Sequence, residues 1–541
     1  MRDDYSFGTL GHNHLLSTAQ KAFARAETSG AEAMAEIETG IRLLCMAFVE
    51  FPLNSPLAGQ LLALKAKSPL VGRLLTEAGL RLAAAVAPVG TANDMVAEQL
   101  FADRRFDEME ARFDTLAARP GALPVARQAL MRQTMLSRWQ WAESFVRESL
   151  SRSAPDLAAA LLPDILLAGQ QYEQAVPACE KLVSLFGLPL GGFRLALARA
   201  GAGDVEGAKS ILSRILKVFP DHVSALLALD RIVFPPAYDA RLEGRCAVSI
   251  YSYNKADELR RTLESVLASD LASGADAVSV RVLINGSEDD SLAVAEAARE
   301  GFGGVMEVVA LPVNVGAPAA RNWLLDAARR DGAEWIAFLD DDVLVPGDWL
   351  CGLAAGTRDF PDAGVWGCRV ADAVSPSLTQ HADGFLLDRG ETMNQDHEVA
   401  IHEPGIECLV PDFLAYRRYC ASVTGCCHLF RVETLAGNRG FDLGFSPSQF
   451  DDLDSDLRLL AGGKPAAYLG DVAVTHLRPA NPFMTQSQSS QVLGESHRSL
   501  LDGRHATHLD QLVGVQEGIV ADDLAARRNR LTEIGLLGKE R

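Results

Sequence analysis

The spacing of apolar residues divides the chain into two parts. Over about the first 235 residues, apolar side chains recur every three or four positions within Ala-, Leu-, Arg- and Glu-rich segments, which predicts helices throughout. Pro235 and Pro236 interrupt this pattern, and a short charged linker is expected to end at Arg245. Beyond it, short apolar runs alternate with amphipathic segments, which predicts an α/β fold built from βαβ units around a mainly parallel sheet.

The second part can be assigned element by element. Strands are expected at 246–251, 278–284, 305–311 and 335–339, and helices at 256–268, 293–299 and 317–330. Ligands of such a sheet bind beyond the carboxyl ends of the strands, so the polar residues that follow each strand are the first candidates for chemistry.

An internal repeat runs through the helical part. Four residues 33 positions apart are each followed three residues later by Met or Ala: Phe106, Trp139, Tyr172 and Val205, with Met109, Ala142, Ala175 and Ala208. This period resembles a degenerate tetratricopeptide array, in which small residues lie where paired helices touch. Stacked helix pairs offer a curved surface for a partner, and packing against the second domain is the equally open alternative.

The length of the chain predicts several domains, and its charge disfavours some classes of partner. A chain of 541 residues exceeds one hydrophobic core, and we expect a helical repeat domain at 1–238, an α/β domain at 245–479 and a C-terminal helical extension at 480–541. With 51 Lys and Arg against 71 Asp and Glu, the formal charge of −20 disfavours nucleic acid and anionic membranes as partners.

The sequence also predicts a cytoplasmic protein. Met1–Tyr5 leads into a polar stretch instead of a signal peptide, and the most apolar segment, Leu80–Val89, is too short to span a membrane. Nine scattered cysteines fit reduced thiols. The cluster of Cys420, Cys426, Cys427 and His428 matches no common zinc spacing, so we expect buried small residues there.

Polar residues follow each of the first three predicted strands. The first strand ends in Tyr253-Asn254 and the second in Asn285-Gly286-Ser287, a turn that exposes backbone N–H groups. The third ends in Asn314-Val315-Gly316, ahead of Ala320-Arg321-Asn322 at the next helix.

The fourth strand runs directly into Asp340-Asp341-Asp342. Three adjacent carboxylates repel one another, and a divalent cation relieves that repulsion. Oxygen ligands suit Mg²⁺ or Mn²⁺ shared with phosphate oxygens. A solvated acidic turn is the alternative, but a hydrophobic strand that feeds into the triplet favours a buried site.

A second acidic segment lies farther along the chain. Asp451, Asp452, Asp454 and Asp456 fall within six positions, and in a helix Asp452 and Asp456 share a face while the other two point elsewhere. One of them would serve as a general base, although acids at a helix N-terminus are also favoured by the dipole alone. His476 follows an apolar run at 472–474, where a lone His is usually a core residue.

Taken in order, these segments resemble family 2 glycosyltransferases of the GT-A fold over about 245–479. The matching elements are the opening strand with Tyr253-Asn254, the turn at Asn285-Gly286, the Asn314–Asn322 segment, the Asp340-x-Asp342 motif, the acid pair Asp451-Asp452 with Arg458 seven residues on, and His476.

The resemblance implies an inverting transferase that uses a nucleotide-sugar donor and Mn²⁺ or Mg²⁺. Asp342 would hold the metal, with Asp340 at the ribose or the metal's water shell and His476 completing the coordination. Asp452 would act as general base, with Asp451 as the fallback. The donor would contact Arg321 at its diphosphate, and Tyr253, Asn254, Asn285, Gly286, Asn314, Gly316, Asp340 and Asp341 elsewhere.

Several alternatives stay open. Family members that use UDP-sugars carry Asp where this chain has Ile284, which cannot make that hydrogen bond, so the nucleotide is not assigned. A repeat-protein scaffold with a weak or inactive site and a glycoside hydrolase with two acids are the other hypotheses. The acceptor is a protein held by the repeats, a polysaccharide, a lipid-linked glycan or a small molecule. Residues 371–419 show no motif, and 480–541, expected to turn helical around 519–534, would pack beside the site or form a homo-oligomer.

Overall fold

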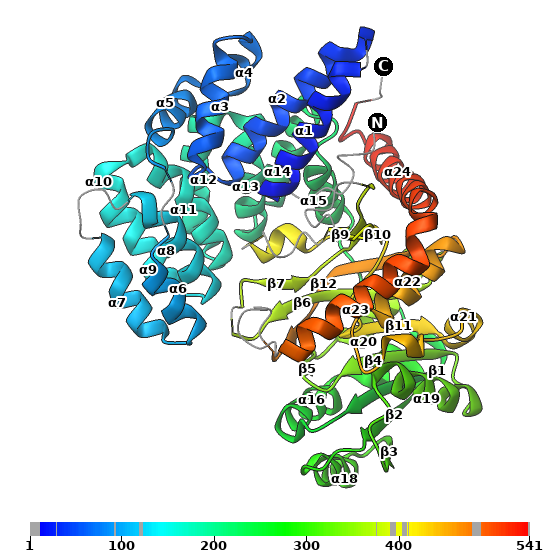
Figure 1. The fold of residues 1–541 in the computed structure, drawn as a ribbon. Coiled ribbons are helices and arrows are strands. Elements are labelled where there is room, and N and C mark those ends of the chain that lie inside the picture. The colour runs from blue at the N-terminus through cyan, green and yellow to red at the C-terminus, as the bar shows by residue number, and fades with distance from the viewer. Residues whose placement is uncertain are drawn as a thin grey trace.

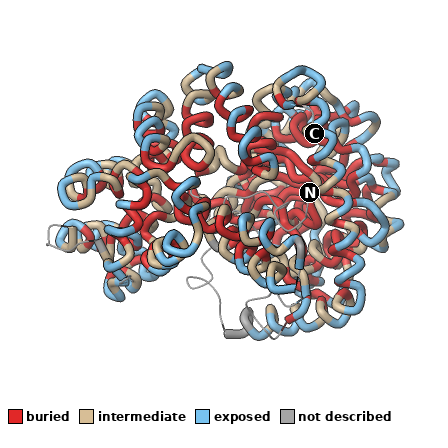
Figure 2. Tube along the Cα trace, turned by 90° about the horizontal axis from the view of Figure 1, so that it is seen from above, coloured by how far each residue is buried: buried red, intermediate tan, exposed pale blue. Residues whose placement is uncertain are grey.

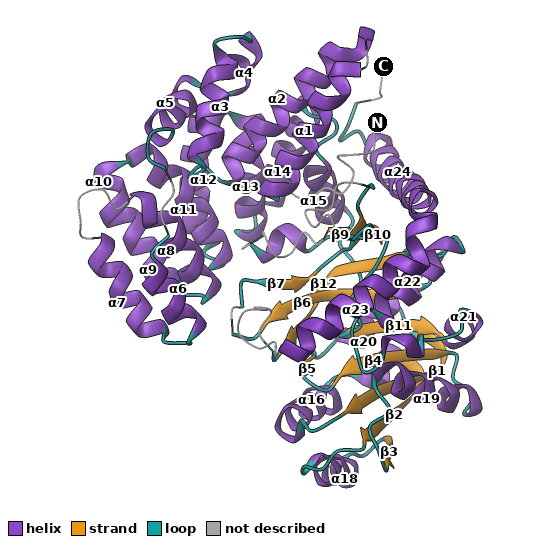
Figure 3. Cartoon of the chain, in the orientation of Figure 1, coloured by secondary structure: helices purple, strands orange, loops and turns teal. Residues whose placement is uncertain are grey.

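The computed structural model describes residues 11–28, 30–90, 93–117, 123–374, 376–389, 397–402, 408, 410–478 and 488–538. The predictions made for residues 1–5 and for the polar stretch at 480–487 lie outside these ranges. A helical region comes first and an α/β region follows it (Figure 3). None of the described helices is both long and apolar enough to cross a bilayer.

The first region is helical, as predicted. Its described helices are α1 (His12–Thr28), η2 (Gly30–Glu32), α2 (Ala33–Glu50), α3 (Ser55–Lys65), α4 (Pro69–Leu74), α5 (Glu77–Val86), α6 (Met95–Ala102), α7 (Phe106–Ala117), α8 (Leu123–Met135), α9 (Trp139–Ser144), η3 (Phe145–Leu150), α10 (Ser151–Ser153), α11 (Pro155–Ala168), α12 (Tyr172–Phe186), α13 (Leu188–Gly201), α14 (Val205–Val218) and α15 (Val223–Val233).

The 33-residue period is visible in the backbone. Each of the four period-marking residues begins a helix, α7, α9, α12 or α14, and the residue three positions on is fully buried. One residue in each preceding turn has a positive φ, namely Arg104, Ser137, Gln170 and Gly203. Every such turn repeats the same three backbone hydrogen bonds to the helix before it. The region is therefore a structural repeat, and its membership of the tetratricopeptide class stays a prediction.

The α/β region is built on one large sheet in the order β10-β12-β6-β11-β4-β1-β2-β3 (Figure 1). Parallel pairing joins β3, β2, β1 and β4 and also β6 with β12, whereas β10 and β11 run antiparallel to their neighbours. Its strands are β1 (Leu242–Ser252), β2 (Ala275–Asn285), β3 (Val305–Leu311), β4 (Trp335–Asp340), β6 (Val365–Asp372), β10 (Arg417–Cys420), β11 (Cys427–Arg431) and β12 (Ala466–His476). Shorter strands are β5 (Val343–Leu344), β7 (Thr379–His381), β8 (Phe385–Leu386) and β9 (Ile401–His402).

This mixed, mostly parallel sheet confirms the predicted α/β architecture. All the strands that precede candidate residues point their carboxyl ends to one edge. The associated helices are α16 (Ala256–Ala268), α17 (Leu271–Gly274), α18 (Ser291–Gly301), α19 (Ala317–Arg330), α20 (Trp349–Asp359), α21 (Val432–Gly437), α22 (Asp451–Ala461), α23 (Gln488–His505) and α24 (Leu509–Glu533), with short turns η5 (Pro411–Leu414), η6 (Leu443–Phe445) and η7 (Ala506–His508).

Two predicted boundaries were wrong. The first strand begins at Leu242, so the end of the expected linker belongs to the sheet: Leu242 is buried and pairs with Ala275 across a bulge. The C-terminal segment is already helical from Gln488, about 30 residues before the expected start, because contacts of α23 and α24 with the α/β region offset its polar composition.

The helical and α/β regions share one hydrophobic core, seen as continuous burial in Figure 2. Phe413, in the unassigned segment at 371–419, packs against Phe193 of α13 with ring centroids 5.2 Å apart. Beside it, the Tyr172 hydroxyl donates to Asp412 Oδ2 at 2.6 Å. The repeats are thus fixed to the sheet on at least one face.

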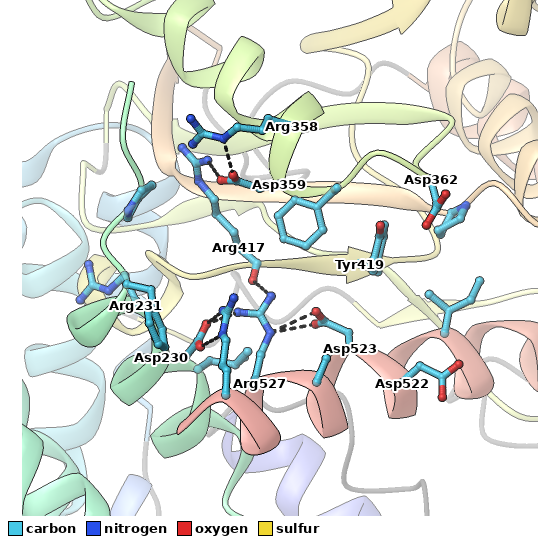
Figure 4. A pocket seen from close by; sticks show the side chains of 18 of the residues that line it. Asp230, Arg231, Arg358, Asp359, Asp362, Arg417, Tyr419, Asp522, Asp523 and Arg527 are labelled. Carbon is cyan, nitrogen blue, oxygen red and sulfur yellow. Dashed lines mark hydrogen bonds and ion pairs between the residues drawn. The ribbon is translucent and has the colours of Figure 1, made fainter. Parts of the chain in front are cut away.

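Helix α24 closes the other side of this junction. A cavity of about 730 Å³ lies between α15, α24 and the amino ends of β6 and β12 (Figure 4). Arg527 donates to Asp230 Oδ2 at 2.6 Å and also bonds Asp523, so the cavity wall is an ion-pair network. The cavity is at the edge of the sheet opposite the candidate residues.

Helix α23 is held to the α/β region by a histidine between two carboxylates. His397 Nδ1 lies 2.7 Å from Asp502 Oδ2, and its Nε2 lies 2.9 Å from Glu495 Oε2. Burial disfavours the charged imidazole, but the hydrogen bonds to Glu495 and Asp502 outweigh it and raise the pKa of His397.

Candidate active site

Hydrogen bonds connect the loop that follows β1 to the loop that follows β2. Asn254 adopts a positive φ of 52°, and its Oδ1 accepts from the backbone N–H of Glu288 at 2.8 Å. The Asn254 N–H donates to Ser287 Oγ at 3.1 Å. The neighbouring Tyr253 is 43% exposed, so its ring is accessible to a ligand. Asn254 therefore shapes the loop, and Tyr253 is its outward-facing residue.

Side-chain hydrogen bonds also connect the loop after β2 to the loop after β3. Asn285 is buried, donates to Asn314 Oδ1 at 3.0 Å and accepts from the Val315 N–H at 3.0 Å. Asn314 Oδ1 also accepts from the Gly316 N–H at 2.8 Å. At Gly286 (φ +70°) a Cβ would lie 2.3 Å from the Val313 carbonyl carbon, so only glycine fits. These residues build the floor of the candidate donor site.

The acidic triplet at the end of β4 has a partner that the sequence interpretation missed. Lys255 Nζ lies 2.7 Å from both Asp341 Oδ1 and Asp342 Oδ2. Burial disfavours the ammonium, but the two carboxylates outweigh it and raise the pKa of Lys255. Burial likewise opposes the charged form of Asp342, but its hydrogen bond to His476 and the charge of Lys255 lower its pKa. The position of Lys255, directly after Tyr253-Asn254, is the signal that could have revealed it.

Asp340 faces away from that lysine. It accepts from the Tyr251 hydroxyl at 2.9 Å, and Arg321 Nη2 lies 3.3 Å from it. Its backbone N–H donates to the Cys426 carbonyl at 3.0 Å, which ties the end of β4 to the start of β11. Asp340 thus points toward the middle of the edge, with 23% of its side chain exposed.

His476 is oriented by a glutamine from the unassigned segment. Gln380 Nε2 donates to Asp372 Oδ2 at 2.8 Å and to the Arg478 carbonyl at 2.6 Å. Because both partners only accept, Gln380 Oε1 faces His476 Nδ1 at 2.8 Å, and Nδ1 carries the proton. The other nitrogen, Nε2, is presented to Asp342 Oδ1 at 3.1 Å. This is how a metal-binding histidine is usually held.

A divalent cation fits this part of the structure. Ligand atoms of Asp340, Cys426 and His476 all lie within 4.8 Å of one another. Of the three predicted metal ligands, Asp340 and His476 belong to this group. Asp342 is not part of it, but its Oδ1 lies 3.1 Å from His476 Nε2. The cysteine cluster is buried, as predicted, yet Cys426 also belongs to this group.

The predicted catalytic acids differ in their surroundings. Asp451, at the start of α22, is buried and its Oδ2 accepts from Arg321 Nη1 at 2.6 Å. Burial raises the pKa of Asp451 despite that ion pair. Asp452 is half-buried and accepts from the Gly425 N–H at 2.7 Å. Arg321, itself 4% exposed, is thus engaged by Asp451 and Asp340, whereas a diphosphate contact was expected of it.

The two other acids of this helix confirm the predicted faces. Asp456 accepts from the Ser422 hydroxyl at 2.8 Å and the Val423 N–H at 3.0 Å, on the same side as Asp452. Asp454 points elsewhere and bonds Arg458 and His505. Both are fully buried, so they fix the position of the helix.

Polar loops and carboxylates converge at the carboxyl edge of a mixed, mostly parallel sheet, which is the arrangement of the GT-A fold class. Residues 247–424 match the family described as Glycosyl transferase family 2, so the chain contains a domain of this family. The match includes the loops of the candidate donor site and the acidic triplet, and it ends before Cys426, the Asp451-Asp452 pair and His476.

Three solved structures are similar to part of this chain. GalNAc-T7 with UDP, GalNAc and Mn²⁺ is 12% identical with a TM-score of 0.34, covering 50% of this chain and 57% of that one. S. aureus TarS 1–349 is 15% identical with a TM-score of 0.33, covering 54% and 73%. The mannosyltransferase PcManGT from Pyrobaculum calidifontis with GDP-Man and Mn²⁺ is 16% identical with a TM-score of 0.33, covering 60% and 88%. No curated protein matched the chain.

Proposed function

We propose that the chain is a metal-dependent, inverting glycosyltransferase that moves a sugar from a nucleotide-diphosphate donor to an acceptor hydroxyl. The observation that carries this proposal is the convergence of three parts of the chain on Gly425–Cys426. Asp452 bonds the Gly425 N–H, and Cys426 lies within 4.8 Å of ligand atoms of Asp340 and His476. A candidate base and a candidate metal site are thus neighbours at the carboxyl edge of the sheet.

Asp340, Asp342 and His476 would hold a divalent ion, Mn²⁺ or Mg²⁺. When bound, the ion neutralises the departing diphosphate as a Lewis acid. Gln380 would hold His476 in the orientation in which Nε2 can bind the ion, and Lys255 would keep Asp342 charged.

Asp452 would act as the general base. The acceptor oxygen attacks the anomeric carbon, its proton passes to Asp452, and the bond to the phosphate oxygen breaks with its electron pair remaining on the diphosphate. One displacement inverts the anomeric centre. Asp452 suits this role better than Asp451 because it is half-buried, while Asp451 is buried against Arg321. Arg321 would position Asp451 and Asp340.

The donor would lie over the floor formed by the β1, β2 and β3 loops, with Tyr253 against its base. Ile284 is 2% exposed within a hydrophobic core cluster, so it cannot read a base by hydrogen bonding. This residue is the observation that favours the scaffold alternative. The contacts of Asp342 with Lys255 and His476, and of Asp452 with the Gly425 N–H, favour an active transferase site instead.

The helical repeats would help recognise the acceptor, which we propose to be a protein. The shared core holds the repeats in a constant position relative to the sheet, as acceptor presentation requires. Deleting them would expose that core, so surface substitutions on the repeats are the appropriate test.

The experiment is binding of a nucleotide-sugar panel with and without Mn²⁺ to wild type, Asp342→Ala and Asp452→Asn. We expect one nucleotide sugar to bind only with metal, and Asp342→Ala to lose that binding. Asp452→Asn should bind the donor normally but lose sugar transfer. If the folded wild-type protein binds no member of the panel, the scaffold interpretation replaces this proposal.

A further inference from the structure

We infer that Cys426 supplies a sulfur ligand to the proposed metal site, which makes it a mixed oxygen, nitrogen and sulfur site that favours Zn²⁺ or Co²⁺ over Mg²⁺. The inference rests on the metal site of the proposed transferase. It concerns the identity of a ligand, so it can be tested without sugar transfer.

The geometry places the three donors together. Asp340 ends β4, Cys426 immediately precedes β11 and His476 ends β12, and their ligand atoms lie within 4.8 Å of one another. In a tetrahedral site with bonds of about 2.0–2.3 Å, ligand atoms are roughly 3.3–3.8 Å apart. The side chains therefore need to close by no more than about 1.5 Å, which a rotation within one rotamer well provides.

The backbone holds this arrangement in place. The Asp340 N–H bonds the Cys426 carbonyl at 3.0 Å, so these two ligand-bearing segments cannot separate freely. Gln380 fixes the histidine ring from behind at 2.8 Å. Each donor thus rests on an element of the central sheet, which is the rigid support that a metal site requires.

The fourth candidate, Asp342, is less available than Cys426. Its Oδ2 already contacts Lys255 Nζ at 2.7 Å and Arg478 Nε at 3.3 Å. The Cys426 sulfur accepts a hydrogen bond from Thr424 Oγ1 at 3.6 Å. A metal ion at Asp340, Cys426 and His476 would meet Asp342 at its other oxygen, Oδ1, which lies 3.1 Å from His476 Nε2, and would leave the contact of Oδ2 with Lys255 in place.

A thiolate ligand changes which metal is preferred. Soft sulfur ligands select Zn²⁺ and related ions, whereas carboxylates and water suit Mg²⁺ and Mn²⁺. When the ion binds, a metal–sulfur bond forms, the S–H bond breaks and the proton passes to solvent. No oxidant or other reactant is needed.

The test is a Co²⁺ titration of the full-length protein followed by absorption spectroscopy. A cobalt–thiolate bond gives an intense near-ultraviolet charge-transfer band that oxygen and nitrogen ligands do not give. We expect wild type to develop this band at one equivalent of Co²⁺. Cys426→Ser should lose the band, and the matched variant Cys351→Ser, which alters another buried cysteine on α20, should keep it.

Two results would overturn the inference: Co²⁺ binding without the band in wild type, or a band that survives in Cys426→Ser. Cys426→Ala gives the same comparison if the serine variant does not fold. A band in a protein that binds no nucleotide sugar would leave this inference standing and refute the transferase. Mn²⁺-dependent donor binding without the band would refute this inference and leave the proposed transferase standing.

Discussion

Replacing Arg321 by methionine tests whether this residue holds the active site together or binds the donor. The guanidinium is 4% exposed, and Asp451, its partner at 2.6 Å, is 2% exposed. Methionine fills similar space but leaves Asp451 buried without a cation and removes the contact to Asp340. Removing one partner of a buried ion pair costs about 3–5 kcal/mol. For a region of this size, that lowers Tm by about 6–20 °C.

The assay is thermal unfolding of Arg321→Met, Asp451→Asn and the double variant. The double variant should be more stable than the sum of the single changes predicts, because no unpaired charge remains at that pair. Arg330→Met is the matched control: its pair with Asp326 is on the same helix but about 65% exposed, so it should cost about 0–1 kcal/mol. If Arg321→Met costs no more than this control and instead weakens nucleotide binding, Arg321 contacts the diphosphate and our interpretation is wrong.

Three further predictions concern single sites. Gly286→Ala should destabilise the protein more than Gly332→Ala, because both glycines have a positive φ but only at Gly286 would a Cβ collide with backbone; chemical denaturation that gave equal losses would contradict this. The raised pKa of His397 means that its contacts stabilise the fold fully below about pH 6.5 and less as pH rises through the raised value. Tm measured against pH should therefore fall through that interval in wild type and stay flatter in His397→Gln. Gln380→Met should weaken Mn²⁺ binding by about 10–100-fold, and an unchanged Mn²⁺ affinity by electron paramagnetic resonance would remove its positioning role.

The periodicity of apolar residues within each segment was enough to predict most helices and strands of the α/β region, and with them the order in which the candidate residues follow the strands. The helices at Ala256–Ala268 and Ala317–Arg330 and the strand at Val305–Leu311 were predicted with the observed bounds. Apolar periodicity reports which face of an element is buried, and that property belongs to each segment alone. For the same reason the 33-residue period was visible in the sequence before the turns were known.

The tertiary structure alone decided which of these residues meet. Lys255 contacts acids 86 and 87 positions away, Arg321 contacts Asp451 130 positions away, and Gln380 reaches His476 across 96 positions. No periodicity records such pairs, because each depends on how separate strands are ordered in the sheet and not on the spacing within any one of them. The start of β1 and the early start of the C-terminal helical extension, at Gln488, were not located for the same reason: partners elsewhere in the chain stabilise segments whose own composition is polar.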